Sequence, residues 1–152
     1  MNCYMELALK EAYKSYKKGD VPVGTVIVKN GKIIAKAHNL KEKKHNPLMH
    51  AEIIAINKAS KRLKRWRLDD CELYVTMEPC MMCTGAIIQS RIKKVYYSIE
   101  NHDFGALKNI SQDKKYGITV DNTIGADESL KMIKSFFEER RKKWTFLFIF
   151  VL

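Results

Sequence analysis

Two short motifs constrain this sequence more than any other feature. Residues 50–52 read His-Ala-Glu, and residues 79–83 read Pro-Cys-Met-Met-Cys. Cys80 and Cys83 are three residues apart, so a helix that begins beside them places both sulfur atoms on one face of its first turn. Pro79 suits such a start, because its ring fixes φ and the N–H that it lacks has no partner there. Each motif therefore predicts the N-terminus of a helix.

Together the motifs offer the ligands of a catalytic zinc site. The positive end of a helix dipole favours the thiolate forms of Cys80 and Cys83, and the thiolate is the form that binds metal. His50 supplies a third ligand from the start of a second helix. Two thiolates and a neutral imidazole neutralise Zn²⁺ and leave one tetrahedral position open for water, whose pKa the metal lowers to about 7. We expect one zinc ion per subunit.

Glu52 is the candidate acid–base residue. It lies two residues after His50, a spacing that separates side chains on the surface of a helix. If His50 stands at the very start of the helix, both side chains reach one cavity, and Glu52 shuttles protons beside the zinc-bound hydroxide. Glu78, directly before Pro79, is a second carboxylate near the motif, and no catalytic role is predicted for it.

The motifs also have simpler interpretations. Cys-x-x-Cys at the start of a helix that follows a strand is typical of thioredoxin-like proteins, and a lone histidine is usually a core or surface residue. Chance produces His-x-Glu followed at this distance by Pro-Cys-x-x-Cys in on the order of one chain in 10⁴, which favours the metal site. Cys3 and Cys71 lie outside the pattern and are predicted to be packing thiols.

Hydrophobic periodicity predicts an α/β sandwich with a mixed sheet. Helices are expected over 5–16, about 49–63, 80–90 and roughly 127–143, and strands over 25–28, 33–37, 73–77, 94–99 and 118–120. Asn30-Gly31 between the first two strands is a strong hairpin signal, because both turn positions need positive φ.

One domain is expected for the 152 residues. All motifs fall in residues 1–143, and residues 144–152 form an apolar tail that is not a separate domain. The tail is too short for the ~20 residues of a membrane span, so packing in the core or at a dimer interface is expected. Residues 1–18 carry charges throughout and are no secretory signal, which predicts a cytoplasmic protein with reduced cysteines.

The formal net charge of +11 favours polyanionic partners, although a lysine-rich solvated surface gives the same number. Basic residues gather in three clusters, in the loop 41–44, around Trp66, and at 140–143. We expect Arg140, Arg141 and the loop to contact phosphates, whereas the cluster around Trp66 fits an exterior face equally well.

Many further segments match one known family. They are Val21–Gly24, His38-Asn39, Trp66–Leu68, Leu73–Cys80, Cys83–Ala86, Ser90–Ile92 and Phe136-Phe137 with Arg140-Arg141. With the two motifs, which are the signature of zinc nucleobase deaminases, they resemble the bacterial tRNA-specific adenosine deaminases of the cytidine/deoxycytidylate deaminase superfamily. The resemblance runs from about residue 4 to residue 143.

This resemblance implies a fold, an activity and a partner. The fold is the three-layer α/β/α sandwich of the cytidine deaminases, with a five-stranded mixed sheet and usually in a homodimer. The activity is hydrolytic conversion of the wobble adenosine of a tRNA anticodon to inosine, so the anticodon stem-loop is the partner. His50, Cys80 and Cys83 would hold the zinc, and Glu52 would be the general acid and base.

The resemblance also implies substrate contacts. Asn39 matches the asparagine that holds the flipped base, and an amide can donate and accept across a purine edge. Capping of its own loop is the other interpretation of Asn39. The remaining residues implied to contact the substrate are Val23, Asn101, Arg140 and Arg141.

The loop after Ile99 departs from the family pattern. Asn101 stands where the family usually has Asp, and Asp103 stands where it has a basic residue. Asn can accept or donate a hydrogen bond and carries no charge. Because the ribose 2′-OH separates RNA from DNA, we hypothesise weaker discrimination against deoxyadenosine in this protein.

Two other functions fit part of the sequence. A free nucleobase or nucleoside deaminase, acting on guanine or cytosine, shares the zinc ligands but does not need so basic a surface. A non-catalytic RNA-binding module with structural zinc needs a fourth protein ligand, for which His38, His45 and His102 are the remaining candidates.

Overall fold

The computed structural model describes residues 2–122 and 124–151, with side chains described as far as residue 145. A five-stranded mixed sheet forms the centre of this part of the chain, in the order β2-β1-β3-β4-β5. Its strands are β1 (Gly24–Lys29), β2 (Lys32–His38), β3 (Cys71–Met77), β4 (Lys94–Ile99) and β5 (Thr119–Asp121). β1 pairs antiparallel with β2 and β3, whereas β3, β4 and β5 run parallel.

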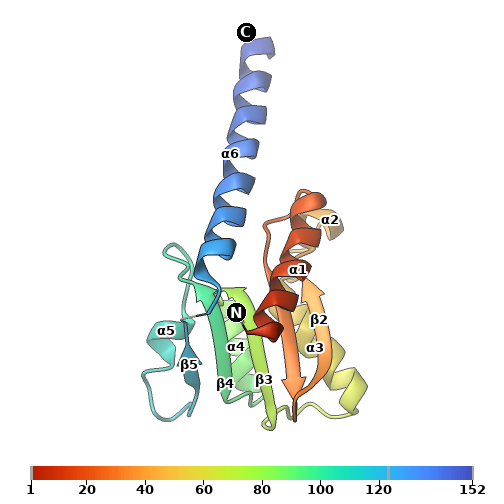
Figure 1. Cartoon of the computed structure of the whole chain (residues 1–152), viewed down its shortest axis with the longest axis vertical. Helices are drawn as coiled ribbons and strands as arrows, with labels where there is room; N and C mark the ends of the chain where they lie inside the picture. Colours follow the sequence, from red (N-terminus) through yellow and green to blue (C-terminus); the bar gives the residue numbers. More distant parts are fainter. Residues whose placement is uncertain (1, 123, 152) are drawn as a thin grey trace.

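Helices cover both faces of the sheet, as predicted. In Figure 1, α1 (Cys3–Lys17) and the base of α6 (Ala126–Val151) lie in front of it, and α3 (Ala51–Leu63) and α4 (Met81–Gln89) lie behind. Two short helices, α2 (Lys41–Lys44) and α5 (Leu107–Ile110), stand in connecting loops. The predicted α/β/α sandwich is confirmed.

Glycine is needed at two positions in the first third of the chain, one in a turn with positive φ and one where a helix packs against a strand. In the turn between β1 and β2, Asn30 has φ 47° and Gly31 has φ 73°, the pair of positive values that the predicted hairpin needs. At the start of β1, a Cβ on Gly24 would lie 1.9 Å from the carbonyl oxygen of Ala8. Only glycine therefore lets α1 pack directly against β1.

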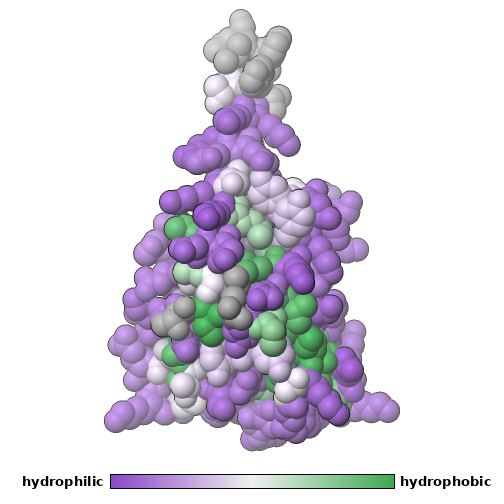
Figure 2. Space-filling view, viewed as in Figure 1, coloured by the Kyte–Doolittle hydropathy of each residue, from purple (hydrophilic) through white to green (hydrophobic). Residues whose placement is uncertain are grey.

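The sheet is buried on both faces. One face, with Ile27, Leu73 and Val75, belongs to the main core cluster that also includes residues of α3 and α4. The other carries a smaller cluster in which α1 contributes Met5 and the strands contribute Tyr74. Figure 2 shows a mainly hydrophilic rim on this face of the molecule, with hydrophobic residues gathered in its middle and lower part.

The predicted ends of the molecule need one correction. The last helix, α6, continues to Val151 and includes most of the segment 144–152 that the sequence predicted as a tail. Its far half rises beyond the sheet (Figure 1). The packing predicted for the apolar side chains of 146–152 lies outside the described residues. Among the described helices, none is both long enough and apolar enough to cross a membrane.

Candidate active site

The three predicted metal ligands come from two helix starts. His50 is the N-cap residue of α3 and Cys80 is the N-cap residue of α4, and neither side chain forms a capping hydrogen bond at the start of its helix. Both side chains are therefore free to turn into the space between the helices. Cys83 lies in the first turn of α4 and is fully buried.

These side chains form one compact group. The His50 Nδ1 atom lies 3.7 Å from Cys80 Sγ and 3.6 Å from Cys83 Sγ. One ligand atom from each residue lies within 4.8 Å of the others, and no further Cys, His or carboxylate among the described residues joins them. The group is suited to hold a metal ion with three protein ligands.

Hydrogen bonds distribute charge within the group. The bond with Cys83, and then the bond with His50, lower the pKa of Cys80 to about 4. The bond with Cys80 raises the pKa of His50, and the same partner together with burial raises the pKa of Cys83. These bonds favour the thiolate form of Cys80, the form that binds metal.

Glu52 lies in the first turn of α3 and its residue is only 4% exposed. Burial raises the pKa of its carboxyl. Burial therefore favours the protonated form of this carboxyl, and a carboxyl that can carry a proton is what general acid–base catalysis requires. The start of α3 thus brings a metal ligand and a proton carrier into the same space.

A cavity of about 870 Å³ opens above this group. Its volume falls in the range that small-molecule sites occupy. The predicted residues among those that line it are Val23, Asn39, His50, Glu52, Cys80 and Asn101. Phe104 from the loop after β4, and Ile133 and Phe137 from α6, also line it. Arg140 and Arg141 do not line this cavity.

Asn39 follows β2 and is 7% exposed. Its Nδ2 donates to the carbonyl of Val21 at 3.2 Å, and its Oδ1 accepts the N–H of Lys41 at 3.2 Å. The backbone carbonyl of Asn39 accepts a 2.7 Å hydrogen bond from Ser15 Oγ. The loop-capping interpretation of Asn39 is therefore real, and one N–H and one lone pair of the amide remain beside the cavity.

Asn101 also stabilises its own loop. Its Oδ1 accepts the N–H of Phe104 at 3.1 Å, and its carbonyl accepts the N–H of Gly105 at 2.8 Å. The side-chain oxygen that could accept from a ribose hydroxyl thus already has a partner within the loop.

Two buried carboxylates hold the cavity walls: Glu78, which the sequence placed near the motif without a role, and Asp20, which the sequence did not single out. Glu78 accepts the N–H groups of Asn101 at 3.2 Å and Lys108 at 2.9 Å, which ties the loop after β4 to the start of α4. Asp20 accepts the N–H groups of Glu42 and Lys43 at 2.6 and 3.0 Å, which anchors α2. Each pair spans at least 22 residues of sequence, so no local pattern indicates it.

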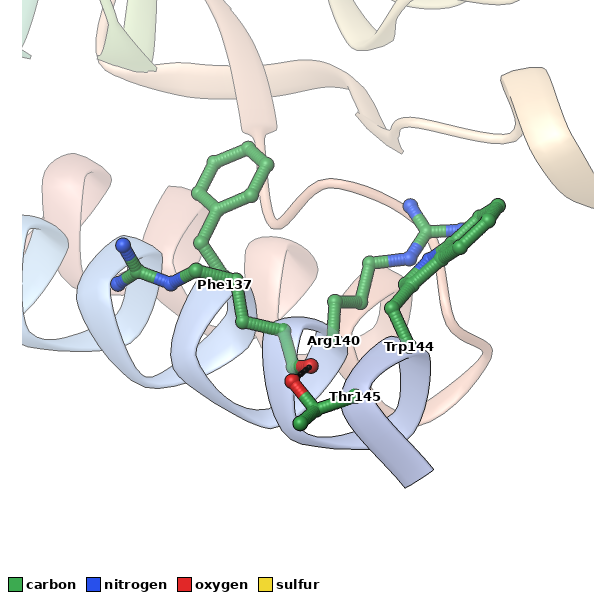
Figure 3. A pocket seen from close by; sticks show the side chains of 5 residues that line it. Phe137, Arg140, Trp144 and Thr145 are labelled. Carbon is green, nitrogen blue, oxygen red and sulfur yellow. Dashed lines mark hydrogen bonds between the residues drawn. The ribbon is translucent and has the colours of Figure 1, made fainter. Parts of the chain in front are cut away.

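The three basic clusters differ in their surroundings. Arg65 and Arg67 pair with Asp69 and Asp70 beyond the C-terminus of α3, whereas the cavity lies at its N-terminus. Of the loop cluster, only Lys41 lines the cavity. The third cluster borders a second cavity of about 740 Å³, which Figure 3 shows from close by; its lining residues are Phe137, Arg140, Arg141, Trp144 and Thr145.

Comparisons with known proteins agree with this geometry. The sequence profile of the MafB19-like deaminases matches residues 1–141. A tRNA-specific adenosine deaminase of Bacillus subtilis is 43% identical over 145 residues, which cover 92% of this chain and 90% of that protein. A solved structure from a study of A-to-I editing by tRNA:A34 deaminases shares 33% identity and a TM-score of 0.80, over 86% of this chain and 98% of that one.

A second solved structure, a guanine deaminase from Bacillus subtilis, is 43% identical over 68% of each chain, with a TM-score of 0.64. The matching profile, the extent of the match to curated relatives and the shared fold lead to one assignment. The chain belongs to the MafB19-like deaminases and, among them, to the family of the bacterial tRNA-specific adenosine deaminases.

Proposed function

We propose that this protein is a zinc-dependent hydrolase that converts the wobble adenosine of a tRNA anticodon to inosine. One observation supports this activity above all: three metal-ligand side chains form one compact group, and two of them, His50 and Cys80, line the same cavity as the buried carboxyl of Glu52. Relatives named tRNA-specific adenosine deaminases, similar along nearly the whole chain, support the choice of substrate.

His50, Cys80 and Cys83 would hold the zinc. With Zn–S bonds of about 2.3 Å and a Zn–N bond of about 2.0 Å, a tetrahedral site separates sulfur from nitrogen by about 3.5 Å. The 3.6 and 3.7 Å separations found here fit that geometry. When bound, zinc lowers the pKa of a water molecule and so supplies a nucleophile at neutral pH.

Glu52 would manage the protons of the reaction. Net hydrolysis adds one water at C6 of adenine and releases ammonia. Glu52 takes a proton from the water, delivers it to the purine ring, and then carries a proton to the departing amino group. Its burial supports this assignment, because a shielded carboxyl keeps its proton until the ring accepts it.

The remaining contacts hold the substrate. The free N–H and lone pair of Asn39 would bind the polar edge of the flipped base, and Val23 would contact its flat face. Asn101 would lie beside the ribose and meet it with an amide N–H rather than a carboxylate. This difference from the family pattern supports the expected weaker discrimination against deoxyadenosine, and equal RNA and DNA selectivity in the protein and its Asn101→Asp variant would refute it.

The partner would be the anticodon stem-loop, with Arg140 and Arg141 on its phosphates. We also propose that residues 1–143 form one deaminase domain, that the protein works as a homodimer, and that it acts in the cytoplasm, where tRNA is found. Sedimentation equilibrium of the purified chain measures the oligomeric state directly.

The test is incubation with an unmodified anticodon stem-loop that carries adenosine at the wobble position. Sequencing the product reports inosine as an A-to-G change, and the same stem-loop with adenosine at a stem position serves as control. Conversion at the wobble position alone supports the proposal, and no conversion by zinc-loaded protein refutes it.

A free-base deaminase is the second candidate, because a guanine deaminase is also similar over 68% of this chain. That enzyme class would release ammonia from free guanine and leave the stem-loop unchanged. Ammonia release from free guanine, cytosine and adenine, measured beside inosine formation in the stem-loop, separates the two candidates.

A further inference from the structure

We propose that Trp144 and Arg140 form a nucleotide-binding platform next to the catalytic cavity, on which a base neighbouring the target adenosine stacks. The inference rests on the proposed activity toward RNA and names a subsite for it. Trp144 is the outermost exposed aromatic residue of α6 with a described side chain, and its residue is 64% exposed.

The platform is continuous with the catalytic cavity. Phe137 lines both the 870 Å³ cavity above Glu52 and the 740 Å³ cavity beside Trp144. Ile133, Phe137, Arg140 and Trp144 follow at helical spacing, so they share one face of α6. The distance from residue 137 to residue 144 along the axis is about 10 Å, which a nucleotide or two can span.

A neighbouring side of α6 attaches the helix to α1. Phe136 on that side is 4% exposed and meets the ring of Tyr16 edge-on with the centroids 6.0 Å apart. Glu139 accepts a hydrogen bond from the hydroxyl of Tyr16. Among the residues with described side chains, every one that lines the outer cavity belongs to α6 itself. The aromatic and basic side chains that line it are therefore available to a ligand.

The chemistry of the face suits single-stranded RNA. The guanidinium of Arg140 lies 5.2 Å from the ring centroid of Phe136, and Figure 3 shows it on the same side of the helix as the Trp144 indole. No carboxylate in the described part of the chain pairs with it. An exposed indole beside a free guanidinium can stack a base and bind its phosphate together.

Charge argues against a second copy of this chain as the occupant. Four consecutive basic residues, 140–143, directly precede Trp144, and the whole chain carries a net charge of +11. Bringing two such faces together would place like charges side by side, whereas an RNA loop supplies the opposite charge.

Trp144→Ala tests the platform, and Trp66→Ala is its matched control. Trp66 is also exposed, at 59%, and also lies beside arginines, but it belongs to the distant ion-paired cluster. The probe is the wobble-adenosine stem-loop, intact or with an abasic site at one of the two positions beside the target. We expect Trp144→Ala to weaken binding of the intact probe about 5- to 150-fold, the range for losing one stacked base.

The abasic probes show whether stacking is the cause. One abasic position should weaken binding to the unaltered protein and to Trp66→Ala, but should have no further effect on Trp144→Ala. Trp144→Phe should restore most of the affinity, because it keeps a ring.

Three results would refute either the proposed function or the Trp144 platform. If zinc-loaded protein makes no inosine in the stem-loop, the proposed function itself fails. If inosine forms but Trp144→Ala binds within twofold of the unaltered protein, the platform is refuted. A change of sedimentation state in Trp144→Ala without a change in RNA affinity would also refute it, and would assign the face to contact between copies.

Discussion

At the scale of single residues, the site depends on where each side chain stands relative to a helix end. As N-cap residues of α3 and α4, His50 and Cys80 have extended backbone conformations, so their side chains leave the helix surface. That position also explains how His50 and Glu52 can act together, because two side chains at this spacing would point apart inside a regular helix. Metal ligand and proton carrier can share one cavity only because α3 begins between them.

Glu52→Ala should separate metal binding from catalysis. The variant keeps His50, Cys80 and Cys83, so we expect an unchanged zinc content and unchanged affinity for the stem-loop. Loss of the acid–base group should slow single-turnover inosine formation by at least about 10²- to 10⁴-fold. Atomic absorption measures the zinc. Turnover near the unaltered rate would show that another group moves the protons.

At the scale of elements, the chain shows what local sequence can and cannot predict. The long helices and β4 follow from periodicity, and the hairpin follows from Asn30-Gly31. The helices α2 and α5 have four residues each, too few for a periodic pattern, and both were missed. Among the metal-site residues, helix starts and Cys-x-x-Cys spacing could be predicted. The support from Asp20 and Glu78 could not, since it depends on backbone groups brought close only by the fold.

Gly105→Ala should break the link between the loop after β4 and α4. An added Cβ would lie 2.3 Å from the Oε2 atom of Glu78 and 2.5 Å from the carbonyl oxygen of Asn101, so one of them must move. We expect a destabilisation of about 1–3 kcal/mol, measured by urea unfolding, because a buried carboxylate loses hydrogen bonds. Gly85→Ala is the control, since nothing lies within 4 Å of its added Cβ. Equal stability of the two variants would contradict this role for Glu78.

Glu11→Gln should weaken the attachment of α1 in a pH-dependent way. Burial opposes ionisation of Glu11, but bonds with Lys14 at 2.7 Å and His38 at 2.9 Å hold the pKa of its carboxyl below the usual 4.5. A carboxyl whose pKa is lower in the folded state stabilises the fold when the pH is above its pKa in the unfolded state. This stabilisation is lost as the pH falls through the pKa of the folded state.

The variant should therefore be less stable by about 1.5–3 kcal/mol at pH 7, the usual effect of bonds to a charged group. The difference should shrink steadily once the pH falls below 4.5. Urea unfolding at a series of pH values measures it. Glu6→Gln, an exposed position on the same helix, should show no such trend. A constant difference at every pH would mean that the charge of Glu11 is not responsible.

At the scale of the whole molecule, the positive charges behind the net charge of +11 differ in how far carboxylates neutralise them. Asp69 and Asp70 neutralise the arginines near Trp66, whereas no described carboxylate pairs with the cations 140–143 on α6. The positive potential is therefore expected to concentrate around the outer half of α6, beside the mouth of the catalytic cavity.

Binding of the stem-loop should fall steeply with salt. Each phosphate contact to a single strand contributes about 0.7 to the slope of log K against log salt concentration. Replacing both Arg140 and Arg141 by Ala should lower that slope by about 1.4. Replacing Arg65 and Arg67 should leave it unchanged, because these side chains already have carboxylate partners. Fluorescence titration between 50 and 200 mM salt, a range in which such contacts matter, measures both slopes. Equal slopes in the two double variants would refute this assignment.

The hairpin turn at Asn30-Gly31 lies at the opposite end of the strands from Val23 and Asn39, which border the catalytic cavity. The catalytic cavity and the hairpin turn thus lie at opposite ends of these strands. A fluorophore or surface tether attached at this turn would leave the mouth of the cavity facing solution. The fold therefore offers a natural attachment point for oriented immobilisation, from which capture and release of single RNA molecules can be watched.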